Sequence, residues 1–369
     1  MCACCAPYGK AQQVSLWVVS YGRRTQKRIS ALRGCNEEIF DYFWGCQVWI
    51  DEYLSLMGAG TITLEAINAA RELKGKNLPD QLFKFRGVDN YALDNLENDS
   101  VWMCSPTQYN DPYDCACTWS TEALWQRSTM ANIEKILNRP ALAAIFSAND
   151  IKNIKGHADP IEKVSHLLLA KTKDRTSQQI ADMVAVVTEG RRQLMEETIV
   201  TMNRHIQEIV KVCSFSTRLD SSVMWGHYAR SHTGFVIEYD VKHIPPDDMR
   251  RMMLMPVVYR KELYNVTEHM LQAAGGGTFN NLFSVIAAMH KAPEWKYEEE
   301  WRFVSLEGAE NKGRNIFMPT PTAVYLGSKI STNDHARIAS IAKKKNIALY
   351  KMELSAREFK LIPGPQLST

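Results

Sequence analysis

The chain has 369 residues, a net charge of +3 and an apolar content of 45%. This composition is typical of a globular protein and excludes wholesale disorder, and the length allows two domains or one elaborate domain. A charge so balanced does not by itself predict nucleic-acid binding, and we expect no membrane span because no uninterrupted apolar run reaches about 18 residues.

The nine cysteines are unevenly spaced, with five of them in the first 50 residues. An odd number of cysteines in a chain without a recognisable secretory leader indicates reduced thiols and a cytoplasmic protein. The group Cys2, Cys4 and Cys5 lacks partners at zinc-finger spacing, and Cys115 and Cys117 have the alternate spacing of residues that pack on a strand. We therefore predict no metal site from the cysteines.

Residues 1–57 differ from the rest and form a predicted N-terminal extension. Basic residues at 23–28 precede an aromatic-rich stretch at 40–53, whose interspersed carboxylates predict an amphipathic helix. Two interpretations stay open: a genuine extension, or a natural start at Met57 with over-extended sequence upstream. If residues 1–56 are an extension, we expect the core to fold without them.

The segment from residue 80 to residue 212 changes from mixed to helical character. Residues 82–86 and 100–104 alternate with a period of two and predict strands, and residues 91–96 predict one or two helical turns. Residues 121–212 are mainly helical, because apolar residues recur at helical spacing through 176–212. We expect this stretch to be an insertion.

The remaining sequence predicts a second group of strands with three helices between them. The predicted strands are 212–216, 234–239, 255–259, 301–304, 323–326 and 348–352, and the helices are 261–273, 280–291 and 333–345. Long helical runs between separated groups of strands indicate an α+β fold. We predict a mixed, mainly antiparallel sheet in one domain, residues 80–355, with a large helical insertion and a C-terminal tail at 356–369.

Polar residues set among aromatic ones mark three segments as candidates for a functional site: residues 83–87, 213–234 and 291–304. None of them matches a phosphate loop, a dinucleotide-binding glycine pattern, a zinc-protease helix or a nucleophile elbow. His227 and His232 are five residues apart, which misses the spacing of paired metal ligands on a helix. For either histidine a hydrogen-bonded structural role is the simpler interpretation.

The third segment carries two carboxylates and a cation at alternate positions. On a strand, Glu298, Glu300 and Arg302 would share one face. This pattern is typical of a structural ion pair, and equally of two carboxylates with different tasks, one stabilising positive charge and the other deprotonating a nucleophile. Trp295, Tyr297 and Trp301 could stack on a base or a nicotinamide ring, or pack in the core.

These segments, in this order, resemble a prokaryotic family of unknown function, DUF2971. The resemblance rests on residues 82–86, 96–114, 213–216, 224–235, 295–302 and 326–328, and it covers roughly residues 80–355. The first 60 or so residues fall outside it, and the helical stretch 121–212 does not match residue by residue. The family name implies no activity.

The layout also resembles that of ADP-ribosyltransferases, with a cation on the first strand, a polar strand that carries serine, and a Glu-x-Glu at a later strand. The resemblance implies that NAD is the co-substrate, that Glu300 is the catalytic carboxylate and that Glu298 positions the acceptor. It further implies contacts to NAD from Arg86 for phosphate or ribose, from Ser214 and Ser216 for the nicotinamide ribose, and from Trp225 or Tyr228 for the ring.

Three functions from different classes follow from these observations. The first is an NAD-dependent ADP-ribosyltransferase-like enzyme, a phage-defence or toxin effector with a protein or nucleic-acid acceptor. The second is a nuclease in which Asp114, Glu298 and Glu300 bind a divalent metal. The third is a non-catalytic module for a phosphate-bearing ligand or nucleic acid, held by Arg86, His227 and Arg302. We predict that Arg86, Ser216, Tyr228 and Glu300 line one pocket.

Overall fold

The computed structural model describes residues 48–58, 62–171, 175–274, 280–310 and 312–368. The chain divides into two compact units, Met1–Asp51 and Glu52–Thr369, and the second contains every element discussed below. The basic residues of the predicted extension and its five cysteines lie outside the described residues. The second unit begins at Glu52 and includes the buried Tyr53, so residues 52–57 belong with the core and not with the extension.

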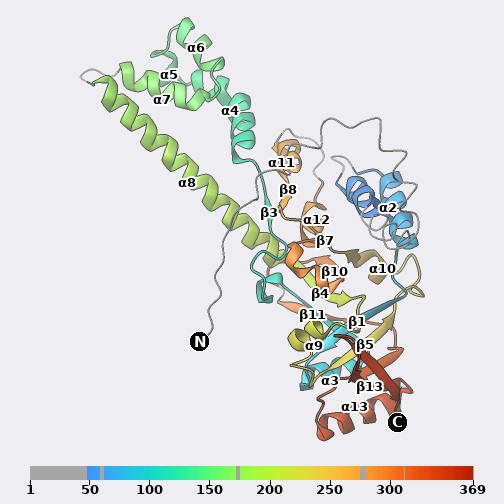
Figure 1. Ribbon diagram of the computed structural model, residues 1–369. Coiled ribbons are helices and arrows are strands. Elements are labelled where there is room, and N and C mark those ends of the chain that lie inside the picture. Colours follow the sequence, from blue (N-terminus) through green and yellow to red (C-terminus); the bar gives the residue numbers. More distant parts are fainter. Residues whose placement is uncertain (1–47, 59–61, 172–174, 275–279, 311, 369) are drawn as a thin grey trace, which may run out of the picture. The chain divides into compact units, whose positions relative to one another are not determined.

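A large, mostly antiparallel sheet forms the centre of this unit (Figure 1). Along it the strands follow the order β11-β2-β4-β1-β5-β12-β13-β14, while β10 pairs with β4 and β6 pairs with β10. Their bounds are β1 Gln81–Arg86, β2 Ser100–Cys104, β4 Val210–Ser216, β5 Phe235–Asp240, β6 Leu254–Pro256, β10 Glu300–Leu306, β11 Gly313–Phe317, β12 Ala323–Leu326, β13 Ala348–Leu354 and β14 Leu361–Gln366.

Strand β4 lies at the branch point of the sheet. One of its edges pairs with β10 along its whole length. Its other edge is shared, because Val212 pairs with Cys104 of β2 and Ser216 pairs with Phe83 of β1. Ser214 lies between these two contacts, and the Lys84 ammonium donates a hydrogen bond to its carbonyl at 2.8 Å. The sheet is therefore split between β1 and β2 beside Ser214.

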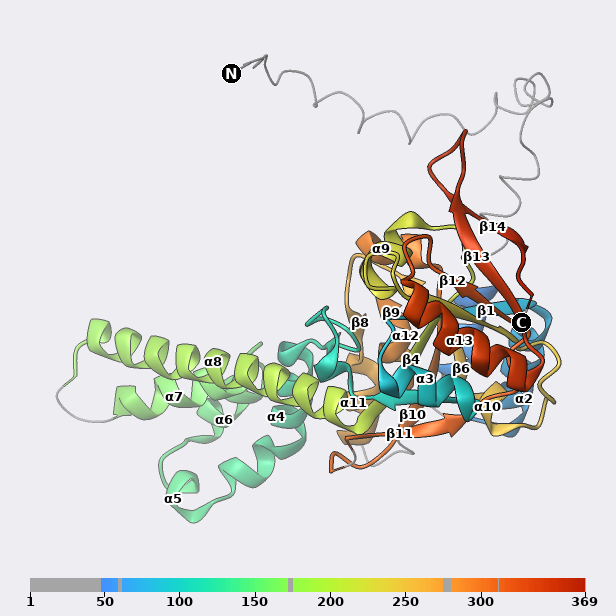
Figure 2. The same cartoon turned by 90° about the horizontal axis from the view of Figure 1, so that it is seen from below.

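Helices pack against this sheet at several places. Helix α13 (Thr332–Lys345) connects the parallel strands β12 and β13 and lies beside α3 (Asn90–Glu97) (Figure 2). Helix α9 (Ser222–Tyr228) packs on β1, and α12 (Phe283–Met289) packs on β10 and β4. The apolar residues of α12 are all buried, which explains why this helix has no polar face.

The insertion between β2 and β4 is helical, as the sequence predicts. Its main helices are α4 Thr121–Leu137, α5 Pro140–Ala143, α6 Ala148–Lys155, α7 Pro160–Lys171 and α8 Ser177–Ile209. They share a small apolar core of their own, built from Ile133, Leu137, Phe146, Ile154 and Val164. Figure 1 shows α7 lying beside α8, the longest of these helices, which runs directly into β4.

The α+β class and the mixed, mainly antiparallel sheet are confirmed. The predicted C-terminal tail is wrong in part, because residues Leu361–Gln366 form β14 at the edge of the sheet, paired with β13. Pro363 and Pro365 hide this strand in the sequence, since proline is tolerated only at such edges. No helix among the described residues is long and apolar enough to cross a membrane.

Candidate functional site

A cavity of about 570 Å³ lies at the split in the sheet, a size typical of small-molecule sites. Strands β1 and β4, helix α9 and the segment that leads into β10 supply most of its wall. The lining residues are Phe83, Lys84, Phe85, Gln108, Tyr109, Asn110, Ser214, Phe215, Ser216, Met224, His227, Tyr228, Lys291, Glu298 and Glu300. Much of the surface is therefore aromatic, with carboxylates, lysines and hydroxyl groups at intervals.

Helix α9 brings His227 and Tyr228 to this cavity because its other face is anchored in the core. Trp225 is fully buried, its ring lies edge-on to Phe85 at 5.4 Å, and its indole N–H donates to the Leu219 carbonyl at 2.7 Å. After the helix the chain passes through three residues with positive φ at 230–232. It then reaches Gly234, where a Cβ would lie 2.1 Å from the Arg86 carbonyl. Only glycine permits this approach.

The two carboxylates reach the cavity wall from different elements. Glu298 ends the short 3₁₀ helix η3 (Pro293–Glu298), Glu299 adopts the left-handed conformation with φ 42°, and Glu300 begins β10. The expectation that Glu298 lies on the same strand as Glu300 is therefore wrong, since the chain turns at Glu299. Even so, the Glu298 and Glu300 carboxylates meet on one cation.

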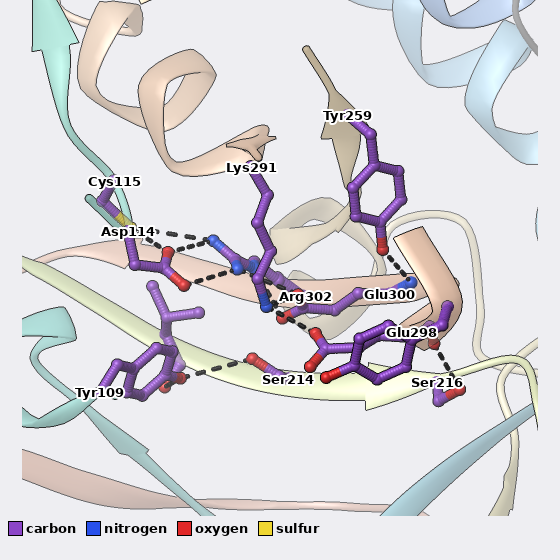
Figure 3. A network of polar contacts seen from close by, with 12 residues as sticks. Tyr109, Asp114, Cys115, Ser214, Ser216, Tyr259, Lys291, Glu298, Glu300 and Arg302 are labelled. Carbon is purple, nitrogen blue, oxygen red and sulfur yellow. Dashed lines mark hydrogen bonds and ion pairs between the residues drawn. The ribbon is translucent and has the colours of Figure 1, made fainter. Parts of the chain in front are cut away.

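That cation is Lys291, in the two-residue strand β9 (His290–Lys291) (Figure 3). Its ammonium donates to Glu298 Oε2 at 2.5 Å and to Glu300 Oε2 at 2.8 Å. Tyr228 donates its hydroxyl proton to the other oxygen of Glu298 at 2.5 Å. The Ser216 hydroxyl donates to the Glu298 carbonyl at 2.6 Å, which fixes the backbone at this point.

Arg302 lies behind this pair and is fully buried. Its Nε and Nη2 donate to Glu300 at 2.7 and 3.0 Å, and its Nη1 and Nη2 donate to Asp114 at 2.6 and 2.9 Å. A further bond from Nη1 reaches the Ala288 carbonyl at 2.8 Å. All five N–H groups of the guanidinium are therefore used inside the protein. The prediction that Arg302 holds a phosphate-bearing ligand is wrong, and the structure shows the alternative interpretation, a structural ion pair.

The surroundings of the two carboxylates push their pKa values in opposite directions. Burial raises the pKa of Glu298, Lys291 offsets this only in part, and the neighbouring Glu300 charge raises it further. Burial acts on Glu300 in the same sense, but Arg302 and Lys291 together outweigh it and hold the pKa of Glu300 well below its usual range. Glu300 thus stays ionised, whereas Glu298 is the carboxyl that can exchange a proton.

The structure brings together most of the predicted site residues. Ser214, Ser216, His227 and Tyr228 line the cavity with Glu298 and Glu300. Trp225 does not, because its side chain points from α9 into the core and is fully buried there.

Arg86 is also a wrong prediction. Ser216 pairs with both Phe83 and Glu300, so these three residues face one side of the sheet. Arg86 is three positions along β1 from Phe83 and therefore faces the other side. Of the four residues predicted to line one pocket, Ser216, Tyr228 and Glu300 line the cavity and Arg86 does not.

Three residues of this network were not singled out by the sequence analysis. Lys291 connects the carboxylates, the Tyr259 hydroxyl accepts a hydrogen bond from the Glu300 backbone N–H at 2.9 Å, and Tyr109 lies 3.5 Å from the Ser214 hydroxyl. None has a periodic signal, because each lies in a loop or a two-residue strand. The only sequence clue was the density of aromatic and charged residues around position 291.

The arrangement offers little to a metal ion. Among the described residues no cluster of three or more His, Cys, Asp or Glu side chains could hold one. Asp114 and Glu300, which the nuclease interpretation needs as ligands, both bind Arg302, so a guanidinium occupies the space between them. The four described cysteines, Cys104, Cys115, Cys117 and Cys213, are free thiols.

Comparison with known proteins finds one family model that matches part of this site. The chain matches no curated protein and no solved structure. The segment that matches a family model, residues 224–303, runs from α9 to β10 and so contains Tyr228, Lys291, Glu298 and Glu300. Residues 224–303 match the family model described as "Protein of unknown function (DUF2971)", the family that the sequence resembles.

Proposed function

We propose that the cavity binds NAD as a substrate and that the protein transfers its ADP-ribose group to an acceptor. The observation that carries this proposal is the paired carboxylates at the cavity wall, Glu298 and Glu300, held together by Lys291. With Glu298 ionised, this cluster contains three carboxylates and two cations. The cluster itself therefore carries one negative charge, while Lys84, a further cation of the cavity wall, donates to the Ser214 carbonyl.

A negative charge among aromatic rings suits a cationic aromatic group. The nicotinamide ring of NAD is such a group, and Tyr228 and His227 offer it flat surfaces at the cavity wall. As the bond between the ring and the ribose breaks, positive charge moves onto the sugar. A fixed carboxylate in a site that excludes water stabilises that charge in the transition state.

The different protonation behaviour of the carboxylates gives each a separate task. Glu300 stays anionic and stabilises the positive sugar. Glu298 accepts a proton from the acceptor hydroxyl, amine or water as the new bond to the ribose carbon forms. The bond to nicotinamide breaks at the same carbon, and the ring leaves as neutral nicotinamide. Tyr228 keeps its own proton, since burial and the adjacent Glu298 raise its pKa, and so it acts as a donor.

This activity would suit a cytoplasmic enzyme. NAD is an intracellular metabolite, and the free thiols among the described residues fit a reducing compartment. Modification of a protein or nucleic acid, or depletion of NAD, would make the protein a phage-defence or toxin effector. Transfer of labelled ADP-ribose identifies the acceptor.

The proposal is tested by incubating the full chain with NAD and measuring nicotinamide release and transfer of labelled ADP-ribose. In the Glu300→Gln variant we expect release to fall by about 10²–10³-fold while NAD binding barely changes, because the charge acts only in the transition state. Glu299→Gln, a change of the exposed carboxylate next in the chain, is the matched control and should keep the wild-type rate.

Two outcomes would overturn the proposal. One is nicotinamide release no faster than in a protein-free blank with protein, RNA and DNA acceptors present. The other is an unchanged rate in a folded Glu300→Gln variant. A parallel incubation with magnesium and nucleic acid tests the nuclease alternative, and binding of ADP-ribose without turnover would indicate the non-catalytic module.

A further inference from the structure

Lys291 occupies a position that neither the sequence motifs nor the family description assigns. It lies in strand β9, which pairs in parallel with β7 (Val258–Tyr259). Only 7% of its side chain is exposed, and its ammonium lies 5.0 Å from the centre of the Trp295 ring. One ammonium therefore contacts two carboxylates at 2.5 and 2.8 Å and an aromatic face at the same time.

The geometry shows why both carboxylates can face one cavity. Two anions that share a buried site repel each other, so that without a cation between them one would take up a proton. Arg302 cannot hold Glu298 in place of Lys291, because its five N–H groups already bind Glu300, Asp114 and a carbonyl. Among the described residues, Lys291 is the cation that contacts Glu298.

The other charged and titratable groups around Lys291 come from several elements. They are Glu298 and Tyr297 from η3, Glu300 and Arg302 from β10, Tyr228 from α9, Tyr259 from β7, and Asp114 from the loop before β3 (Cys117–Thr118). The three tyrosines have raised pKa values because of burial and the nearby carboxylates, so they remain neutral. Charge in this region therefore depends on the three carboxylates, Arg302 and Lys291.

We propose that Lys291 is the positioning residue of the site, holding Glu298 and Glu300 side by side so that Glu298 alone exchanges a proton with the reactants. The catalytic role of Lys291 rests on the proposed function. Its effect on the pKa of Glu298 does not. It limits the acceptor to groups that give up a proton as they attack, namely hydroxyl, amine or amide groups or water. A ligand that only binds would not need this asymmetry.

The test uses the full chain and three substitutions at Lys291. Lys291→Met removes the charge at similar length, Lys291→Gln keeps hydrogen bonding without charge, and Lys291→Arg keeps the charge. Lys74→Met is the matched control, because Lys74 is also buried and donates to the carbonyls of Arg251, Met252 and Leu254 away from the cavity. Its loss should lower the melting temperature and leave the cavity carboxylates unchanged.

The first measurement is the titration of the ¹³C-labelled glutamate carboxyls by NMR, with the Glu298 signal identified by its disappearance in Glu298→Gln. In Lys291→Met and Lys291→Gln we expect its midpoint to rise by about one pH unit or more, because a contacting cation is lost. Lys291→Arg should restore the wild-type midpoint. A midpoint that does not move in the folded Met and Gln variants would overturn the proposal.

The second measurement is the pH profile of nicotinamide release. The acidic limb of kcat/KM should move to higher pH in Lys291→Gln and return in Lys291→Arg, which a purely structural lysine would not produce. The two measurements separate the two claims. Absence of release by the wild-type protein would refute the NAD reaction and leave the NMR result to decide on Lys291. Release with an unshifted Glu298 titration would refute the role of Lys291 alone.

Discussion

Arg302 and Lys291 are the two cations in a series of ion pairs that runs from Asp114 through Glu300 to Glu298, and they differ in their surroundings. Arg302 uses every donor on buried partners, and removing one partner of such a pair leaves an uncompensated charge that commonly costs about 3–5 kcal/mol. Lys291 lies one step closer to the cavity and contacts the carboxylate that can be protonated. Arg302 and Asp114 therefore form the buried end of the cluster, whereas Lys291, Glu298 and Glu300 line the cavity.

The opposite pKa directions of Glu298 and Glu300 predict opposite effects of pH on stability. A carboxyl whose pKa is lowered by folding stabilises above its unfolded pKa of about 4.3, and this stability is lost as the pH falls through the folded pKa. A carboxyl whose pKa is raised contributes most below that value and loses the contribution as the pH rises. Glu300 is the first case and Glu298 the second.

Melting temperatures of two variants between about pH 3 and pH 7 check this. Glu300→Gln should fall behind the wild type as the pH rises from about 3 to about 5, where the unfolded carboxyl titrates. Glu298→Gln should gain on the wild type as the pH rises above about 4. Glu299→Gln, on the exposed neighbour, should follow the wild type. Parallel curves for all three variants would show that the two buried carboxyls do not differ as described.

The sequence predicts part of this cluster. Alternation on a strand places Glu300 and Arg302 on one face, and this is what β10 shows. Alternation cannot predict that Asp114 and Lys291 come to the same place, because they lie in a loop and in a two-residue strand whose positions depend on tertiary packing. Arg86 is the opposite case. A cationic side chain suits a site for NAD phosphate, but its position on β1 directs this side chain to the other side of the sheet.

Elements with strong periodicity were the most predictable. Residues 82–86 and 100–104 form β1 and β2, and residues 177–209 form the long helix α8. The predicted strand 255–259 is broken into β6 and β7 at Val257, whose N–H bonds to the Glu300 carbonyl. Strand β11 was missed because it is short, exposed and polar at an edge of the sheet.

The helical insertion has its own apolar core, so damage to it should stay local. Phe146 is 7% exposed within this core, and truncation of a buried phenylalanine commonly costs about 3–5 kcal/mol. In Phe146→Ala we expect faster hydrogen exchange in α4, α6 and α7 and unchanged exchange in β4 and β10. Ile145→Ala, on the exposed neighbour, should leave all of these elements as in the wild type.

Exchange that rises equally in β4 and β10 would contradict this division. It would mean that the insertion and the sheet unfold as one cooperative unit, in which case the cavity would depend on the insertion for its stability.

The fold places the cavity where several parts of the chain must meet. Strand β1, the loop after β2, strand β4, helix α9 and the segment before β10 all contribute to its wall. Because β4 shares one edge between β1 and β2, the sheet opens beside Ser214. An α+β class could be predicted from the spacing of strands and helices, whereas this split depends on the register of single residue pairs.

The most direct test of the proposed function is a crystal structure of the Glu300→Gln variant with NAD, in which slow turnover preserves the substrate. We predict that NAD occupies the cavity with its nicotinamide ring against Tyr228 and the adjoining ribose beside Glu298 and the substituted side chain at position 300. NAD bound at another surface, or an empty cavity at NAD concentrations that saturate binding in solution, would contradict the account.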